Sequence, residues 1–270
     1  MKRKVKKKVW IFCFIGIAFV TSFCLFNLLL WHFENKKSEK LNNEILDNVI
    51  VDEIKDDGEA LIDNNIEEDI YRKYFDVSLI DVDLNELKNQ NNDTIGWIQV
   101  MGTTINYPVV QSSDNEHYLT HDFLNEPNNG GWIFLDYRND INNLEYNTII
   151  YGHRRFNTDV MFGSLKNTLD EDWFNNYNNH IIKISATGFS YVFQIFSAYT
   201  TTNENSYLQT DFATKSEYEE FLKMIQERSK FDFEAELNGD DKIITLSTCH
   251  NTDDRLVVHG KLIKQVEKTN

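Results

Sequence analysis

The most pronounced pattern in the chain is an uninterrupted apolar run near its N-terminus. Residues 9–31 read VWIFCFIGIAFVTSFCLFNLLLW, and a helix needs about 20 such residues to cross a bilayer. Six Lys or Arg side chains precede the run, whereas the segment after it mixes cations with Glu34 and Glu39. A cleavable signal peptide would have a shorter apolar core and small residues at a cleavage site. The pattern predicts a cytoplasmic basic tail at 1–8 and a single-pass transmembrane signal anchor at 9–31, with the rest extracellular.

Polar and acidic positions dominate the segment that follows. Between Glu34 and Asp93 there are 18 Asp or Glu residues against 7 Lys or Arg residues. The stretch NNEILDNVIVDEIKDDGEALIDNNIEED has no aromatic residue and no domain-like pattern. Such a composition is typical of a solvated spacer. We therefore expect residues 32–70 to form an acidic extracytoplasmic stalk, partly helical, that holds a domain of residues 71–270 away from the membrane.

From about Tyr71 onward the apolar positions follow the period of β-strands. The segment SLIDVDLNELKNQNND predicts a short helix capped by Asp81 or Asp83. Beyond it, runs of β-branched and aromatic residues alternate with the turn signals MGTT, NEPNNG and TGFS. These runs predict eight strands, at 94–100, 105–111, 131–137, 147–153, 180–187, 191–201, 241–249 and 255–266.

One long amphipathic helix interrupts the strands. In SEYEEFLKMIQERSK, Ser216 and Glu219 have the spacing of a capping box. Four apolar side chains follow at helical spacing and predict a face that packs on the core: Tyr218, Phe221, Leu222 and Ile225. Eight strands with so few helices between them favour a mainly β fold, either a closed barrel or a sandwich, over a parallel α/β sheet.

Charge and length narrow the functional classes. The chain has 270 residues, enough for one domain and the N-terminal material. Its net charge of −16 argues against nucleic-acid binding, which needs a basic footprint. The acids outside the stalk are scattered, as with Asp253 and Asp254, and suggest no Ca²⁺ site. We expect no metal and no cofactor.

The cysteines give the first indication of chemistry. Cys13 and Cys24 lie in the apolar run, and Cys249 is alone in the extracellular part. An unpaired exported cysteine is a buried small residue, an intermolecular partner or a reactive thiol. A nucleophilic thiol needs a base and a group that stabilises an oxyanion. His153 ends one predicted strand and Arg255 begins the strand after Cys249, so all three can meet at one rim.

The motifs around these residues resemble those of a known family. TLSTC followed by RLVV, together with NTIIYGH, resembles the active-site segments of sortases, the membrane-anchored cysteine transpeptidases of Gram-positive surfaces. Several further segments resemble class B members: DTIGWIQVMGTTINYPVVQ, DNEHYLTHDF, GWIFLDYRN and MFGSLK. The resemblance implies an eight-stranded sortase β-barrel with N-terminal helices and a long helix before the penultimate strand.

The resemblance also implies residue roles. Cys249 would be the nucleophile, His153 the general acid or base, and Arg255 the oxyanion or substrate clamp. Three residues would line the peptide groove: Asn115, Leu119 and Ser247. The sequence departs from many class B members in the short connection before Arg255, and in His250, which stands where an acidic or polar residue is common. We expect His250 to be a modulator, so that His250→Ala retains substantial turnover.

The implied reaction joins two partners outside the cell. The thiol would cleave a surface-protein precursor after the Thr of a C-terminal sorting motif similar to Leu-Pro-x-Thr-Gly or Asn-Pro-x-Thr. A peptidoglycan stem or cross-bridge amine would then release the thioacyl intermediate. Wall anchoring and pilus assembly, in which a pilin Lys supplies the amine, both stay open.

Two alternatives fall outside the family. A cysteine hydrolase acting on peptidoglycan would place its Cys at the start of a helix with the His later in the chain, an order opposite to the one found here. A non-enzymatic membrane-tethered β-domain that binds a surface partner would hold Cys249 buried and inert, and slow thiol labelling would reveal it.

Overall fold

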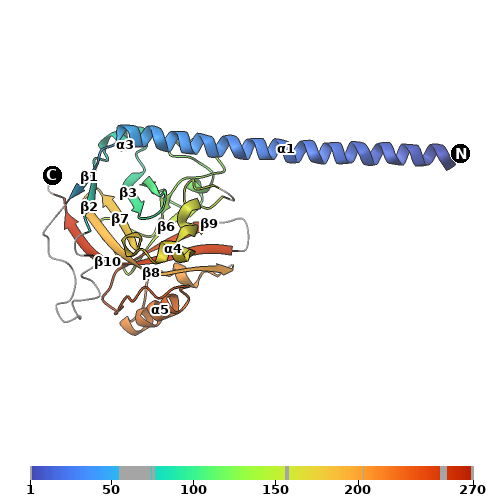
Figure 1. Ribbon diagram of the computed structural model, residues 1–270. Coiled ribbons are helices and arrows are strands. Elements are labelled where there is room, and N and C mark those ends of the chain that lie inside the picture. Colours follow the sequence, from blue (N-terminus) through green and yellow to red (C-terminus); the bar gives the residue numbers. More distant parts are fainter. Residues whose placement is uncertain are drawn as a thin grey trace.

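The computed structural model describes residues 2–54, 74, 77–155, 158–202, 204–249 and 254–268, and it excludes the side chains of residues 2–8 and 249. Eight strands close into one barrel in the order β10-β8-β7-β3-β4-β5-β6-β9 (Figure 1). Their bounds are β3 Thr94–Val100, β4 Asn106–Val110, β5 Phe134–Leu135, β6 Asn147–His153, β7 Ile181–Ala186, β8 Phe189–Thr202, β9 Ile243–Cys249 and β10 Asp254–Glu267. The predicted eight-stranded barrel is confirmed.

Two pairings in the barrel are parallel and the others are antiparallel. β6 pairs in parallel with β9, and β4 with β5. β9 then pairs with β10 in antiparallel register, so β9 lies between β6 and β10. This arrangement brings the C-terminal ends of β6 and β9 and the N-terminal end of β10 to one rim.

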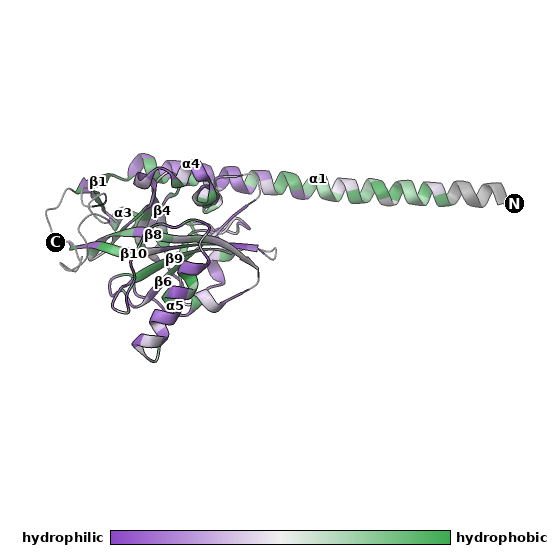
Figure 2. Cartoon of the chain, turned by 60° about the horizontal axis from the view of Figure 1, so that its bottom comes forward, coloured by the Kyte–Doolittle hydropathy of each residue, from purple (hydrophilic) through white to green (hydrophobic). Residues whose placement is uncertain are grey.

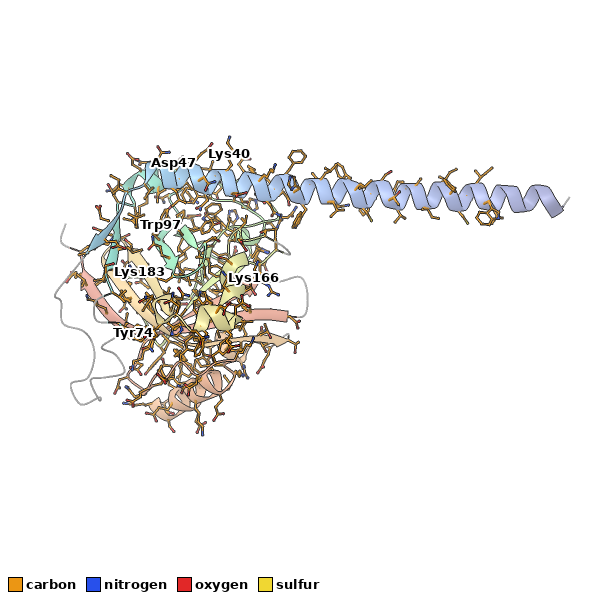
Figure 3. All side chains as sticks on the ribbon, in the orientation of Figure 1. Lys40, Asp47, Tyr74, Trp97, Lys166 and Lys183 are labelled. Carbon is orange, nitrogen blue, oxygen red and sulfur yellow. The ribbon has the colours of Figure 1, made fainter. Side chains whose placement is uncertain are left out.

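The barrel interior is filled by large apolar side chains. Trp97, Ile98 and Phe193 are each fully buried among them. Figure 3 shows the side chains that fill the barrel around Trp97. Helix α5 (Lys215–Glu227) comes before β9, as expected, and its predicted apolar face packs with Phe196, Tyr199 and Val257. That face is thus part of the core.

The start of α5 differs from the predicted capping box. Thr214 is the N-cap, and its Oγ1 accepts a hydrogen bond from the backbone N–H of Glu217 at 3.1 Å. The Glu217 carboxylate in turn accepts from Ala213 N at 2.9 Å. The predicted box at Ser216 and Glu219 was wrong by two residues. The T-x-x-E pattern overlaps S-x-x-E in this sequence. The earlier pattern forms the cap because both of its side chains accept hydrogen bonds from backbone N–H groups at the start of the helix.

Shorter elements complete the fold. β1 (Val51–Ile54) and β2 (Leu79–Val82) form a two-stranded antiparallel sheet beside β7. The predicted short helix is α3 (Asn85–Gln90), whose Asn85 N–H donates to Asp83 at 2.9 Å. The remaining helical pieces are α4 Glu171–Phe174 and the 3₁₀ turns η1 His117–Leu119, η2 Gly163–Leu169, η3 Tyr177–Asn179 and η4 Ser206–Leu208.

Helix α1 (Lys2–Asn48) has two parts with different surroundings. Residues 9–30 project beyond the barrel as an exposed, apolar rod, as Figures 1 and 2 show. The helix Val9–Asn48 contains an 18-residue window of mean hydropathy 2.4, long and apolar enough to cross a membrane. Near Trp31 the character changes, and the more polar second half, which includes Lys40 and Asp47, lies along the barrel (Figure 3).

The second half of α1 falls in the range predicted as a stalk. Leu41 and Ile45 are buried in the barrel-side core, and Ser38 accepts a hydrogen bond from Asn128 at 3.0 Å. This part of the segment therefore packs on the barrel. The expected boundary at residues 70 and 71 falls between residues 55 and 73, outside the described residues, and stays a prediction.

Candidate active site

The strand register places the predicted catalytic residues side by side. In the parallel β6–β9 pair, His153 is the direct partner of Cys249. Neighbouring strands lie about 4.8 Å apart, and directly paired side chains project from the same face. β10 pairs Val257 with Ser247, and extending this register by two residues brings Arg255 opposite Cys249. The backbone thus places Cys249 between His153 on one side and Arg255 on the other.

Two of these three side chains line one open cleft at the rim. The cleft has a volume of about 520 Å³. Its lining combines polar and apolar groups: Asn115, Leu119, Thr120, Asn129, Phe134, Tyr151, His153, Asn205, Leu208 and Arg255. The side chain of Cys249, and His250 as a whole, lie outside the described residues. The predicted role of His250 therefore stays a prediction.

The imidazole of His153 is oriented by a backbone carbonyl. Its Nε2 lies 3.0 Å from the carbonyl oxygen of Leu119. Because a carbonyl oxygen only accepts, Nε2 carries a proton and donates it in this hydrogen bond. Leu119 was predicted as a groove residue, and it lines the cleft. Its backbone adds a function that the sequence did not reveal, because a carbonyl leaves no signature in the residue type.

A glycine makes room for this imidazole. Gly131 has φ +58°, and a Cβ placed on it would lie 2.4 Å from the Tyr118 carbonyl oxygen and 2.8 Å from Cδ2 of His153. Both the backbone conformation and the space therefore demand glycine. Gly130 ended the predicted turn NEPNNG, but Gly131 was predicted as the first residue of a strand, so neither its positive φ nor its contact with His153 was expected.

Replacing Gly131 with alanine should displace His153. We expect Gly131→Ala to lower kcat by at least about ten-fold, because misplacing a catalytic group by about 1 Å costs up to about 10²-fold. Gly188→Ala is the matched control, since Gly188 has no positive φ and meets only the Asn142 side chain, at 3.3 Å. Steady-state kinetics below both unfolding temperatures would measure this. A Gly131→Ala protein with wild-type kcat would contradict the assignment.

Arg255 is held by the η4 turn. Its Nη1 donates to Oδ1 of Asn205 at 2.9 Å and to the Tyr207 hydroxyl at 3.4 Å. The same hydroxyl lies 3.0 Å from Oγ of Ser247. Ser247 is only 1% exposed and is not one of the cleft-lining residues. It contacts Tyr207, and its predicted contact with a peptide stays a prediction.

Asn115 belongs to a charged network at the edge of the cleft. Its Nδ2 donates to Oδ2 of the buried Asp136 at 2.9 Å, and its Oδ1 accepts from Tyr137 N at 3.0 Å. Arg138 and the hydroxyl of Tyr151 donate to the same carboxylate at 2.7 and 2.9 Å. Burial alone would raise the pKa of Asp136, but the hydrogen bonds from Arg138 and Tyr151 outweigh it and hold that pKa below its usual range.

The charge of Asp136 should make the domain sensitive to acid. Because its pKa is lower in the folded state, its stabilisation is fully present above the ordinary Asp pKa of about 3.9 and is lost as pH falls through the folded value. We expect Asp136→Asn to lower the free energy of unfolding at pH 7 by about 1–3 kcal/mol. Thermal unfolding between pH 3 and pH 8 should show a smaller loss on acidification for the variant than for the wild type. If the stability of both proteins fell equally as the pH was lowered, Asp136 would not be the group responsible for the acid sensitivity.

The other described histidines do not line the cleft. His259 is completely buried, and burial, aided by Arg228, lowers its pKa to about 3, so it is neutral at pH 7. His180 is buried against Phe174. His117 and His121 stack on each other in the loop around η1. In the part of the chain that the structure describes, His153 is therefore the one histidine that lines the cleft.

Comparisons with known proteins agree with this geometry. A family model described as the sortase domain matches residues 98–263. Sortase B of Listeria monocytogenes is 37% identical over 185 residues, which cover 67% of this chain and 74% of the relative. A Staphylococcus aureus sortase B–substrate complex superposes with a TM-score of 0.63 at 37% identity, covering 67% of this chain and 84% of that one. A Bacillus anthracis protein described as similar to sortase B gives a TM-score of 0.68 at 34% identity, covering 87% and 98%.

Proposed function

The chain belongs to the sortase family of cysteine transpeptidases, and from that premise we propose that it joins surface-protein precursors to the cell wall. Cys249 attacks the carbonyl carbon of Thr in a C-terminal sorting motif similar to Leu-Pro-x-Thr-Gly or Asn-Pro-x-Thr. One observation carries the proposal: His153 is the direct strand partner of Cys249, and the side chains of His153 and Arg255 line the same cleft.

Each neighbour of Cys249 has a separate task in this reaction. Attack by the thiolate turns the carbonyl oxygen into an oxyanion, which the fixed guanidinium of Arg255 stabilises. His153 gives a proton to the departing amine, which leaves a thioacyl enzyme. An amine of the peptidoglycan stem or cross-bridge then attacks this thioester, His153 accepts its proton, and an amide bond to the wall forms. Asn115 and Leu119 contact the peptide in the cleft.

The reaction can be tested with the full chain in detergent. It would be incubated with a panel of labelled sorting peptides, and with either a peptidoglycan-type amine or a Lys-containing pilin-type peptide as acceptor. We expect mass spectrometry to find cleavage after Thr and a new amide to the peptidoglycan-type amine. Transfer to the Lys peptide alone would assign pilus assembly instead. No cleavage of any peptide would refute the transpeptidase proposal for this panel.

We also propose that residues 9–31 anchor the enzyme with its N-terminus in the cytoplasm. The length and hydropathy of α1 support this placement, as does the basic flank before it. A protease added outside intact cells should remove the catalytic domain along with known surface proteins. A domain that stays intact under those conditions would contradict the proposed sidedness.

A further inference from the structure

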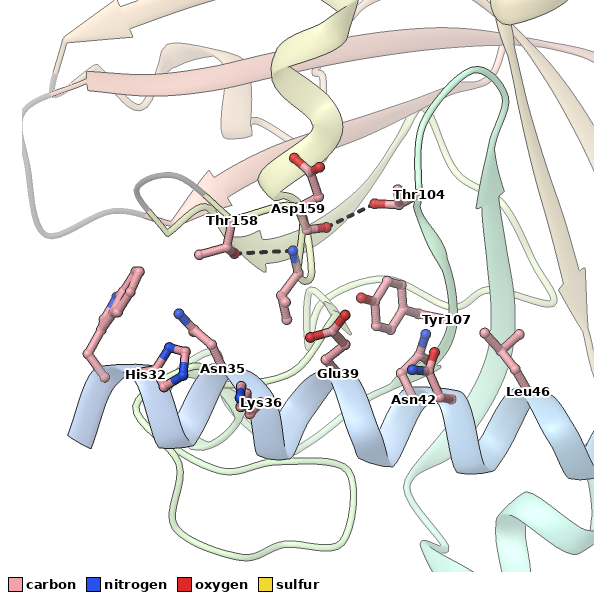
Figure 4. A pocket seen from close by; sticks show the side chains of 13 residues that line it. His32, Asn35, Lys36, Glu39, Asn42, Leu46, Thr104, Tyr107, Thr158 and Asp159 are labelled. Carbon is pink, nitrogen blue, oxygen red and sulfur yellow. Dashed lines mark hydrogen bonds between the residues drawn. The ribbon is translucent and has the colours of Figure 1, made fainter. Parts of the chain in front are cut away.

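A second cleft lies outside the active site, along the seam between α1 and the barrel. Figure 4 shows residues from 31 to 46 of α1 on one side and the segments around Thr104, Tyr107 and Asp159 on the other. The volume is about 580 Å³, and most of the residues that line the cleft have polar side chains. None of its residues lines the active-site cleft. The polar groups that line this second cleft therefore need an explanation separate from the active site.

Each of two buried side-chain amides in this seam has one polar atom with a hydrogen-bond partner and one without. Asn35 is 7% exposed, and its Oδ1 accepts from Arg155 at 2.8 Å, but its Nδ2 has no partner among the described residues. Asn42 is 5% exposed, and its Nδ2 donates to the Asn106 carbonyl at 3.3 Å, but its Oδ1 has none. Both side chains point from α1 toward the barrel (Figure 4). A buried polar atom without a partner is unfavourable, so this seam contains one donor and one acceptor that are unsatisfied among the described residues.

The charged side chains of α1 that line the cleft follow the order of the two amides along the helix. Cations lie near the donor of Asn35, and a carboxylate lies near the acceptor of Asn42. His32 and Lys36 lie on the side of the apolar segment, with the free donor of Asn35 between them. Glu39 lies one turn further, and Asn42, with its free acceptor, one turn beyond that. Neither Lys36 nor Glu39 has an ion-pair partner within the described ranges. The cleft thus offers cations and a donor first, and then a carboxylate and an acceptor.

Tyr107 lines the barrel side of the cleft, near the carboxylates of Glu39 and Asp159. Burial, together with the charges of Glu39 and Asp159, raises the pKa of Tyr107 to about 12. This hydroxyl accepts a hydrogen bond from Met161 N at 3.2 Å. The Asp159 carboxylate binds Lys166 at 2.8 Å on the exposed side. Glu39 is left as the carboxylate available to a positively charged ligand.

The distance of the cleft from the membrane segment, measured along α1, indicates the source of such a ligand. At 1.5 Å per residue, Lys36 lies about 7.5 Å and Glu39 about 12 Å beyond Trp31, the last residue of the apolar run. The headgroup layer of a bilayer extends about 5–8 Å beyond its hydrocarbon core. His32 and Lys36 therefore lie at the level of lipid phosphates, and Glu39 lies just outside it. This step rests on the membrane anchoring proposed above.

We propose that the cleft binds the headgroup of an outer-leaflet phospholipid that carries a phosphate and a primary ammonium, as in phosphatidylethanolamine. The phosphate contacts Lys36, His32 and the free Nδ2 of Asn35. The ammonium contacts Glu39 and the free Oδ1 of Asn42. A phosphatidylglycerol headgroup has no ammonium for Glu39, and the quaternary ammonium of phosphatidylcholine has no N–H to donate to Asn42. The bound lipid closes the seam between the anchor and the catalytic barrel.

Native mass spectrometry of the full chain would test this. The chain would be released from nanodiscs that contain equal amounts of the three lipids with identical acyl chains. We expect at least about ten-fold more phosphatidylethanolamine than either other lipid on the wild type. Glu39→Gln should reduce that preference at least five-fold, and Lys36→Gln should reduce retention of both phosphatidylethanolamine and phosphatidylglycerol. Glu44→Gln, an exposed change on the same helix that lies outside the cleft, should leave the preference unchanged.

Several results would overturn the inference. Equal retention of the three lipids, or a preference that Glu39→Gln leaves intact, would remove the lipid site without affecting the transpeptidase proposal. Binding of soluble glycerophosphoethanolamine as tight as that of the lipid would assign the cleft to a free metabolite. Failure of the chain to enter nanodiscs would remove the anchor and the lipid site together, while sorting-peptide turnover in detergent would still report on the enzyme.

Discussion

Replacing Cys249 with alanine should abolish turnover of a sorting peptide, with a loss of at least about 10³-fold. The physical reason is that the thiolate forms the covalent bond that divides one difficult step into two easier ones. None of the described residues that line the cleft carries a thiol, and removal of a nucleophile in comparable enzymes costs up to about 10⁶-fold in kcat. The measurement is peptide cleavage followed by chromatography, with intact-protein mass spectrometry to detect the thioacyl adduct on the wild type.

The chain provides its own control for this experiment. Cys24 lies in the exposed apolar part of α1, far in sequence from the cleft, and Cys24→Ala should retain wild-type turnover. A Cys249→Ala variant that keeps a tenth or more of the activity would show that another group is the nucleophile. Absence of turnover in the wild type, together with slow thiol labelling, would instead favour the non-enzymatic reading of the β-domain.

Replacing Arg255 with alanine should lower turnover by at least ten-fold, at the low side of the effect of losing one oxyanion donor. Such a loss is typically about 10²–10³-fold, or about 2.7–4 kcal/mol of transition-state stabilisation. Arg255→Lys should not restore normal activity, because lysine keeps the charge but lacks the planar fork of donors. Lys223→Ala, which removes an exposed cation from α5, is the matched control for charge.

A second readout separates two possible roles of Arg255. If the guanidinium stabilises the oxyanion, alkylation of Cys249 by a small reagent should change little in Arg255→Ala. An alkylation rate that falls in step with turnover would show that Arg255 acts by lowering the thiol pKa. Asn205→Ala is informative beside it, because Asn205 holds Nη1 of Arg255 at 2.9 Å. Asn205→Ala should lower turnover by less than Arg255→Ala does. When it is combined with Arg255→Ala in a double variant, it should lower turnover little further.

The barrel was predictable from sequence where strand periodicity and turn signals coincide. β6 was predicted at its observed bounds, 147–153. The strand predicted at 131–137 is only Phe134–Leu135, because Gly131 turns with a positive φ and Trp132 N bonds to the Tyr118 carbonyl in the neighbouring loop. The side chains there are strand-like, but tertiary contacts take the backbone hydrogen bonds that a strand would use.

The candidate site was predictable only in part for a related reason. Cys249, His153 and Arg255 stand at strand ends within segments of specific sequence, so their meeting at one rim could be expected. The groups that orient them, the Leu119 carbonyl and the Asn205–Tyr207 pair, come from distant loops and use backbone or common polar atoms. The packing of α1 was missed because its buried face mixes Asn35, Ser38 and Asn42 with Leu41 and Ile45, which resembles an exposed polar helix.

The contacts of α1 fix the vertical position of the catalytic cleft. Glu34 binds Arg155, two residues after His153, at 2.9 Å, and it accepts from Asn129, a cleft-lining residue, at 2.7 Å. Glu34 lies only about 4.5 Å along the helix beyond Trp31. With residues 9–31 in the bilayer as proposed, these contacts hold the mouth of the cleft at the level of the lipid headgroups. A precursor held in the same bilayer then needs only about two or three extended residues between its sorting motif and its own membrane segment, at about 3.3 Å each.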